Sequence, residues 1–147
     1  MGRDSTKLAF RLSPVEQTFT LEKTDAEFGN EEGSTTIRIR QASQSSVEEI
    51  DELYALIQRK YEDKNPGEVV ISQRWSIQAL RRVQAFHSII QCNIEDENGK
   101  LLFNDDVMKD PKKFQTAWGK LPPAIVDEIM EKIYIVNVSW GPAGNLL

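Results

Sequence analysis

The chain is 147 residues long, carries a net charge of −5 at pH 7, and contains one histidine and one cysteine. Its length suits one compact domain with a sizeable core, and its acidic balance argues against a non-specific nucleic-acid binder, which needs a basic surface. A lone cysteine excludes an internal disulfide, and no apolar run approaches the roughly 20 residues that span a bilayer. We therefore expect a soluble, intracellular protein with no membrane and no nucleic-acid partner.

The amino-terminal part of the sequence predicts an arm followed by a β-hairpin. Residues 1–16 hold few large apolar side chains, which is typical of a flexible arm. Apolar residues then alternate with polar ones over residues 18–22 and again over residues 36–40. The turn-rich residues 29–33 lie between them. We expect the two segments to pair as antiparallel strands that pack on helices or on another subunit.

The clearest helix signal follows this hairpin. Ser45 and Ser46 are each followed three residues later by a glutamate, which is the pattern of a capping box and predicts that the helix begins there. Apolar residues then recur at the three- and four-residue spacing that makes one apolar helix face. They are Val47, Ile50, Leu53, Tyr54, Ile57 and Tyr61.

A second helix is expected after the turn at residues 65–67, with Ser72 as its cap. Its inward-facing residues would be Trp75, Leu80, Val83, Phe86 and Ile90. The arginines on this helix leave open a DNA-recognition role, which the acidic chain disfavours. His87 and Cys92 have no partners at a catalytic or metal-ligating spacing, so we interpret both as structural residues.

A second, shorter hairpin is expected around Asn98 and Gly99. This dipeptide favours a two-residue turn, with residues 93–97 leading in and residues 101–103 leading out. The surrounding acidic residues do not form a calcium loop, because alignment on Gly99 puts Ile94 where the first ligand should be.

Two further helices complete the prediction. Asp110, followed by a proline, fits the N-cap of a short helix with Phe114 and Trp118 on one face and Gly119 at its end. The last helix is expected over residues 123–136 and has a broad apolar side.

Together these elements predict an α+β fold that is predominantly helical. It has three to four helices, an N-terminal β-hairpin and a short second hairpin. The expected domain organisation is a flexible arm over residues 1–16, one globular domain over residues 17–142 and a short tail over residues 143–147.

Four short motifs occur in a recognisable order along the chain. They are Thr35-Thr36-Ile37-Arg38-Ile39-Arg40-Gln41-Ala42-Ser43; Asn93 with Glu97-Asn98-Gly99-Lys100-Leu101-Leu102-Phe103; Phe114-x-x-Ala117-Trp118-Gly119-x-Leu121-Pro122-Pro123; and Val136-Asn137-x-x-Trp140. This order resembles the small proteins encoded among the tail genes of long-tailed bacteriophages, most of all the tail assembly chaperones. The resemblance covers residues 17–142.

The resemblance implies a role in phage assembly without catalysis. Members of this family bind the long, helical tape-measure protein, keep it soluble and help to recruit tail-tube subunits around it. They have no fixed catalytic residues, so the resemblance implies no enzyme activity, no cofactor and no metal. It places the protein in the host-cell cytoplasm during assembly.

Aromatic side chains are the candidates for partner contacts, because aromatic residues are enriched in binding hot spots. We expect exposed positions at Tyr54, Tyr61, Trp118, Tyr134 and Trp140. The alternative for each of them is that it fills the core of the domain itself.

The sequence also allows three other functions: a structural virion subunit, a transcription regulator and an enzyme. The first alternative is a structural tail or neck subunit that stays in the virion as a homo-oligomer, with the arm and the hairpin edge donating strands to neighbouring copies. A small transcription regulator would use the second helix. An enzyme would need a pocket built from scattered acidic, lysine and tyrosine side chains.

Overall fold

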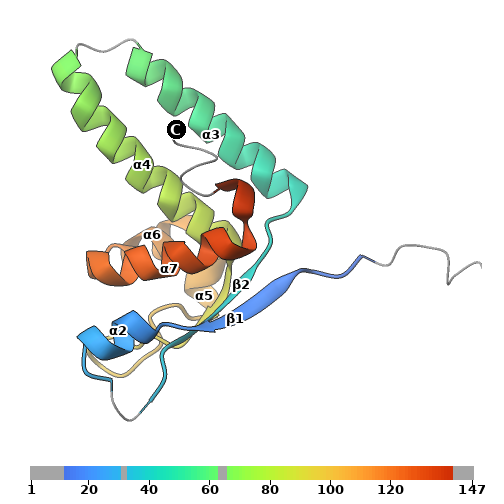
Figure 1. Ribbon diagram of the computed structural model, residues 1–147, viewed down its shortest axis with the longest axis vertical. Helices are drawn as coiled ribbons and strands as arrows, with labels where there is room; N and C mark the ends of the chain where they lie inside the picture. Colours follow the sequence, from blue (N-terminus) through green and yellow to red (C-terminus); the bar gives the residue numbers. More distant parts are fainter. Residues whose placement is uncertain (1–11, 31–32, 63–65, 141–147) are drawn as a thin grey trace, which may run out of the picture.

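The computed structural model describes residues 12–30, 33–62 and 66–140, and the side chains within these ranges except those of residues 56–76. It has an α+β fold in which a three-stranded antiparallel sheet packs against helices (Figure 1). The elements in chain order are β1 (Glu16–Thr20), α2 (Glu22–Glu27), β2 (Thr36–Arg40), α3 (Gln44–Glu62), α4 (Pro66–Ser88), β3 (Ile89–Cys92), α5 (Asp105–Lys109), α6 (Pro111–Trp118), α7 (Pro123–Val136) and the 3₁₀ turn η1 (Val138–Trp140).

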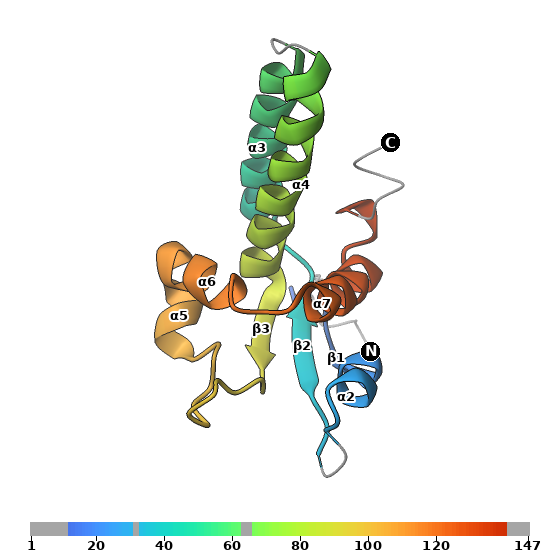
Figure 2. The ribbon, with the colours of Figure 1, turned by 90° about the vertical axis from the view of Figure 1, so that its left-hand side faces the viewer.

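The sheet has the strand order β1-β2-β3, and α7 lies across one of its faces (Figure 2). Phe19 of β1 and Cys92 of β3 both lie opposite Ile37 of β2. Because side chains alternate between the two faces of a strand, these three residues share the covered face. The opposite face carries exposed Thr18 and Arg38, so the described part of the sheet has one covered and one open face.

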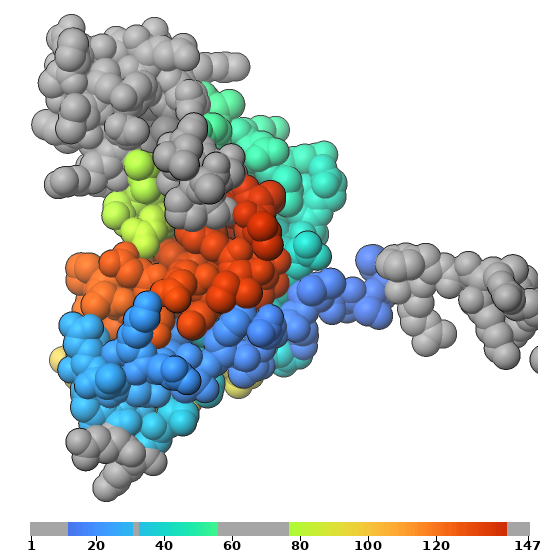
Figure 3. Space-filling model, viewed as in Figure 1, coloured from blue at the N-terminus to red at the C-terminus, as the bar shows by residue number. Residues whose placement is uncertain are grey.

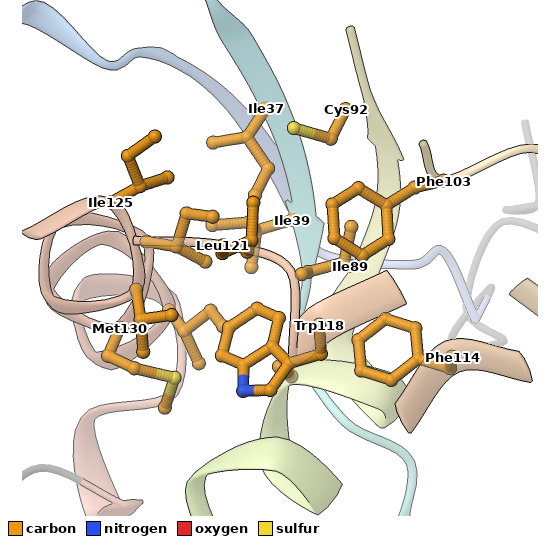
Figure 4. Close-up of a cluster of buried hydrophobic side chains, with 14 of the residues drawn as sticks. Ile37, Ile39, Ile89, Cys92, Phe103, Phe114, Trp118, Leu121, Ile125 and Met130 are labelled. Atoms are coloured by element: carbon orange, nitrogen blue, oxygen red, sulfur yellow. The ribbon is translucent and has the colours of Figure 1, made fainter. Parts of the chain in front are cut away.

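The hydrophobic core lies between the covered face of the sheet and the helices α6 and α7 (Figure 4). The α6 rings of Phe114 and Trp118 stack with centroids 5.7 Å apart and planes inclined by 20°. Asp110 accepts hydrogen bonds from the backbone N–H groups of Lys112 and Lys113 and so caps α6, as its sequence predicts. The prediction of α7 over residues 123–136 is also confirmed.

Two buried polar side chains of the last helical region attach it to distant parts of the chain. The Glu128 carboxylate accepts the backbone N–H groups of Lys23, at 2.9 Å, and Thr24, at 2.8 Å. This caps the first turn of α2, whose own N-cap residue, Leu21, makes no side-chain cap. A carboxylate from a helix roughly a hundred residues away therefore replaces a local capping residue.

Asn137 makes the second attachment, directly after α7. Its Oδ1 accepts the backbone N–H of Ala42 at 2.9 Å, and its Nδ2 donates to the backbone carbonyl of Arg40 at 3.1 Å. The buried amide thus pairs with the backbone where β2 ends and the chain turns toward α3. Both donor and acceptor would lose their partners if the side chain were shortened.

Several predicted boundaries are wrong, and α2 and α5 were not expected. Helix α3 begins at Gln44, before the expected start, because the Ser43 side chain accepts the Ser46 backbone N–H at 3.3 Å and acts as the cap. Helix α4 begins at Pro66, a favourable first position, rather than after Ser72. It ends at Ser88, so Ile90 lies in β3, which the helical pattern did not indicate.

The second hairpin exists, but its turn differs from the prediction. Asp96 N donates to Lys100 O at 2.7 Å, and Gly99 N donates to Asp96 O at 3.0 Å. Asp96 and Lys100 thus close a loop of three residues rather than the two expected for Asn98-Gly99, and within this loop only Gly99 has a positive φ, of 76°. The predicted flexible arm, residues 1–16, overlaps β1, which begins at Glu16. Residues 1–11 of that arm and the predicted tail, residues 143–147, lie outside the described part of the chain.

Replacing Asn137 with alanine should destabilise the fold by about 1–2 kcal/mol, because two partly buried backbone groups lose their partners. Urea unfolding followed by circular dichroism measures this change. The matched control is Asn98→Ala in the exposed turn, which should change the free energy of unfolding by less than about 0.5 kcal/mol. Equal effects at the two positions would contradict the role of Asn137.

Burial raises the pKa of the Cys92 thiol from 9.0 to about 11. As the pH rises, the thiol of the unfolded chain ionises before that of the folded chain. The free energy of unfolding should therefore fall as the pH rises from 9 to 11, and Cys92 should cause no pH dependence below pH 9. A thiol-specific reagent at neutral pH should label Cys92 in urea-unfolded protein and hardly at all in native protein. Equal labelling rates would show that the residue is accessible.

Candidate protein-binding site

A groove of about 570 Å³ lies between the hairpin of residues 94–102 and the corner that joins α6 to α7. In Figure 2 this hairpin lies below α5 and α6, and the α6–α7 connection passes beside it. The groove is lined by Ile94, Glu95, Asp96, Glu97, Asn98, Leu102, Lys120, Leu121, Pro122 and Ile125. Segments that are about 20 residues apart in sequence thus form its two walls.

The floor of the groove is apolar and continuous with the core. Leu121 and Ile125 are buried side chains that also appear in the core cluster of Figure 4. Half-buried Ile94 and Leu102 pack against the same cluster from the hairpin side. An apolar side chain of a partner placed here would therefore contact the core of the domain.

The hairpin wall carries three acidic residues in a row, Glu95, Asp96 and Glu97. The Asp96 carboxylate accepts the backbone N–H groups of Asn98, at 2.8 Å, and Lys100, at 3.0 Å. These hydrogen bonds, first that of Lys100 and then that of Asn98, hold the pKa of Asp96 below its ordinary value. The hairpin wall is therefore negatively charged at neutral pH, and Lys120 is the cation in the lining.

Backbone contacts hold the hairpin in its shape. Leu102 N donates to Ile94 O at 2.9 Å, and Glu95 forms a bridge with Leu101. The left-handed conformation of Gly99 closes the loop. A second cavity, of about 310 Å³, lies between this hairpin and helices α5 and α6 and shares Asp96, Leu102 and Lys120 with the groove. The hairpin therefore borders both hollows.

The described aromatic candidates for partner contacts do not form one site. Trp118 and Trp140 are only 7% and 4% exposed and lie in the core, so the expectation that they are exposed is wrong. Their apolar spacing reflects packing within the domain. Tyr134 is half-buried and donates a hydrogen bond to Gln84 at 3.0 Å, and burial raises its pKa. Tyr54 packs partly against the core.

The side chain of Tyr61, the fifth candidate, lies outside the described residues. The groove residues were missed because the acidic run at 95–97 reads only as part of a turn. A signal was present, since apolar residues flank that run and recur at Leu121-Pro122. Their proximity in space, however, arises only from the fold.

His87 joins the start of α3 to the end of α4. Its Nδ1 lies 3.0 Å from Ser46 Oγ, and its Nε2 lies 3.2 Å from Glu49 Oε2. A serine, a histidine and a carboxylate in contact resemble a nucleophilic triad, but Ser46 Oγ is also bonded to the capping Ser43 and does not line the 150 Å³ cavity beside His87. His87 is therefore hydrogen-bonded, and its contacts join the start of α3 to the last turn of α4.

A metal site and a membrane-spanning helix are both absent from the described part of the chain. Among the described residues, no three histidine, cysteine or acidic side chains are grouped so that they could hold a metal ion. No helix within those residues is both long enough and apolar enough to cross a bilayer. Comparison with protein-family models, curated proteins and solved structures finds no significant match to this chain.

Gly99→Ala should destabilise the protein by about 1–2 kcal/mol, because a Cβ atom is unfavourable in the left-handed conformation. Gly99→Asn, which also adds a side chain, should cost less, since asparagine tolerates this conformation better. Urea unfolding gives the free energies, and amide chemical shifts of residues 94–102 report the hairpin. If both variants match the wild type, the strained turn is not what shapes the groove wall.

Proposed function

We propose that this chain is a phage tail assembly chaperone, a non-catalytic protein that binds the tape-measure protein through the groove. The observation that carries this proposal is an apolar floor bordered by three consecutive acidic residues, 95–97. The resemblance of the sequence motifs to tail assembly chaperones supplies the identity of the partner. The groove supplies the chemistry by which such a partner would be recognised.

The groove favours one kind of ligand. Its floor of Ile94, Leu102, Leu121 and Ile125 would accept the apolar side chains along one stripe of a helix. The acidic rim attracts lysine or arginine residues that flank such a stripe, and it disfavours acidic segments. We therefore expect the bound segment to be an amphipathic, positively charged helix of the tape-measure protein.

Binding of this kind explains how a small acidic protein would keep a long helical partner soluble. An exposed apolar stripe promotes aggregation, and covering it with a charged domain removes that surface from water. The bound chaperone also adds negative charge to the complex, since its own net charge is −5. Recruitment of tail-tube subunits would be a later step, carried out in the host cytoplasm by the chaperone bound to its partner.

A structural subunit that remains in the virion is the second candidate. The observation in its favour is the outer edge of β1, along which no strand of the described residues pairs and which offers a surface for a neighbouring copy. This candidate requires the protein in finished particles, whereas the chaperone requires a complex with the tape measure before assembly.

The test is co-expression with the long, coiled-coil-rich protein encoded nearby, followed by co-purification. The wild-type chain should make that protein soluble and elute with it. Reversing two rim charges with Glu95→Lys and Glu97→Lys should weaken binding by about tenfold or more at low salt, and by less at high salt, because the attraction is electrostatic. Titration of the isolated partner segment gives the affinities.

The matched control reverses two exposed charges on α3, with Glu48→Lys and Asp51→Lys. It changes the net charge by the same amount at a site away from the groove and should leave the affinity near that of the wild type. Equal losses in the two variants would mean that net charge, not the groove, governs binding. A partner that stays insoluble with the wild-type chain, together with recovery of the chain in finished particles, would replace the chaperone with the structural subunit.

A further inference from the structure

The hydrogen bonds at the two ends of the β1–β2 ladder define which way the backbone of β1 faces. Leu21 N donates to Thr35 O, and Gln41 N donates to Val15 O, each at 2.7 Å. In an antiparallel ladder, backbone groups of successive residues point alternately to one side and the other. The odd-numbered residues of β1 therefore direct their N–H and C=O groups toward β2.

The even-numbered residues Glu16, Thr18 and Thr20 direct theirs to the outer edge. No other strand among the described residues pairs with β1 on this side, and Figure 3 shows the strand at the surface, below α7. Pro14 ends the row, because it has no backbone N–H to offer. The edge thus presents three consecutive outward residues that are ready to form a ladder.

Exposed apolar side chains lie near Val15, the residue that precedes β1. Val15 is 58% exposed, Val138 is 76% exposed, and Ile135 in the last turn of α7 is 51% exposed. Val15 and Asn137 bond to adjacent backbone positions in residues 41–42, which brings Val15 and the end of α7 to one corner. Large apolar side chains gathered at an open strand edge indicate a protein contact.

We propose that β1 is a dimerisation strand that pairs antiparallel with β1 of a second copy of this chain. The two-fold axis of this dimer passes beside Thr18. Thr18 therefore lies opposite Thr18 of the other copy, and Glu16 lies opposite Thr20 of the other copy. All three outward residues of each copy then form hydrogen-bonded pairs. The two sheets then become one continuous sheet.

Charge and geometry select this register over its neighbours. A register centred on Glu16 would place two carboxylates directly opposite each other, which is destabilising, and would leave Thr20 unpaired. The register centred on Thr18 keeps these carboxylates apart, and each stays free to pair with Arg38 of its own chain. The strand carries no lysine, the charge that most often blocks pairing at a strand edge.

The dimer surface and the groove lie at opposite edges of the sheet. The groove hairpin follows β3, whereas the pairing edge belongs to β1, and β2 separates the two strands. Dimerisation would leave the groove of each copy accessible, so each dimer would have two grooves. The inference does not rest on the proposed function, because it concerns a different surface and a second copy of the same chain.

The first test measures the mass of the full chain in solution by light scattering during gel filtration. The expected mass is twice 16.8 kDa. Thr18→Lys should shift the protein to a monomer, because it places two like charges opposite each other at the axis, whereas Thr18→Val keeps a β-branched residue and should remain a dimer. A wild-type monomer at the highest soluble concentration would overturn the proposal.

Cysteine cross-linking tests the register. Oxidation of Thr18→Cys should give a covalent dimer, because the Cα atoms of a hydrogen-bonded pair lie about 5.5 Å apart, within the range of a disulfide. Thr20→Cys is the control. In this register the two Thr20 residues of a dimer are offset by four residues along the strands, about 13–14 Å, so the cysteines should remain unlinked. Buried Cys92 does not compete. Equal cross-linking at both positions, or none at Thr18, would overturn the two-fold pairing.

Discussion

The fold depends on the buried polar side chains that tie the last helical region to the sheet. Glu128 and Asn137 each satisfy two backbone groups in segments that precede them by roughly a hundred residues. Backbone donors and acceptors that are buried must find partners, and here side chains supply them where no strand or helix does. α2 and the end of β2 are held in place in this way, and the core can close between the sheet and α7.

This attachment also positions the surfaces that we assign to binding. With α7 fixed across β2, its first turn brings Ile125 to the floor of the groove, and the preceding corner brings Leu121. The hairpin of residues 94–102 faces them from the end of β3. The groove therefore depends on a long-range arrangement, although the acidic wall itself is held by local hydrogen bonds within its turn.

Two surfaces of different chemistry follow from a sheet that helices cover on one face. At one edge, β3 continues into the hairpin that borders the apolar, acidic-rimmed groove. At the other, β1 offers an outer edge along which no strand of the described residues pairs. A dimer formed through β1 would present a helical ligand with two grooves. Binding at the first groove would then raise the effective concentration of the ligand at the second.

Much of the secondary structure follows from local sequence. The alternation in residues 36–40 and the apolar period of residues 123–136 predict β2 and α7, because each pattern places one face of its own segment in the core. The cap at Asp110 depends on a side chain and backbone groups only two or three residues apart. Such signals need no knowledge of the rest of the chain.

Other features were decided only by the tertiary structure. Helix α2 lacks a local cap and depends on Glu128, and Ile90 enters a strand because β2 lies beside it. Trp118 and Trp140 look the same in sequence as surface aromatics, and only packing buries them. The groove joins residues 94–102 to residues 120–125, and no periodicity within either segment specifies the other. Sequence by itself determined the local elements, since these follow from side-chain spacing; contacts between distant segments determined the sites.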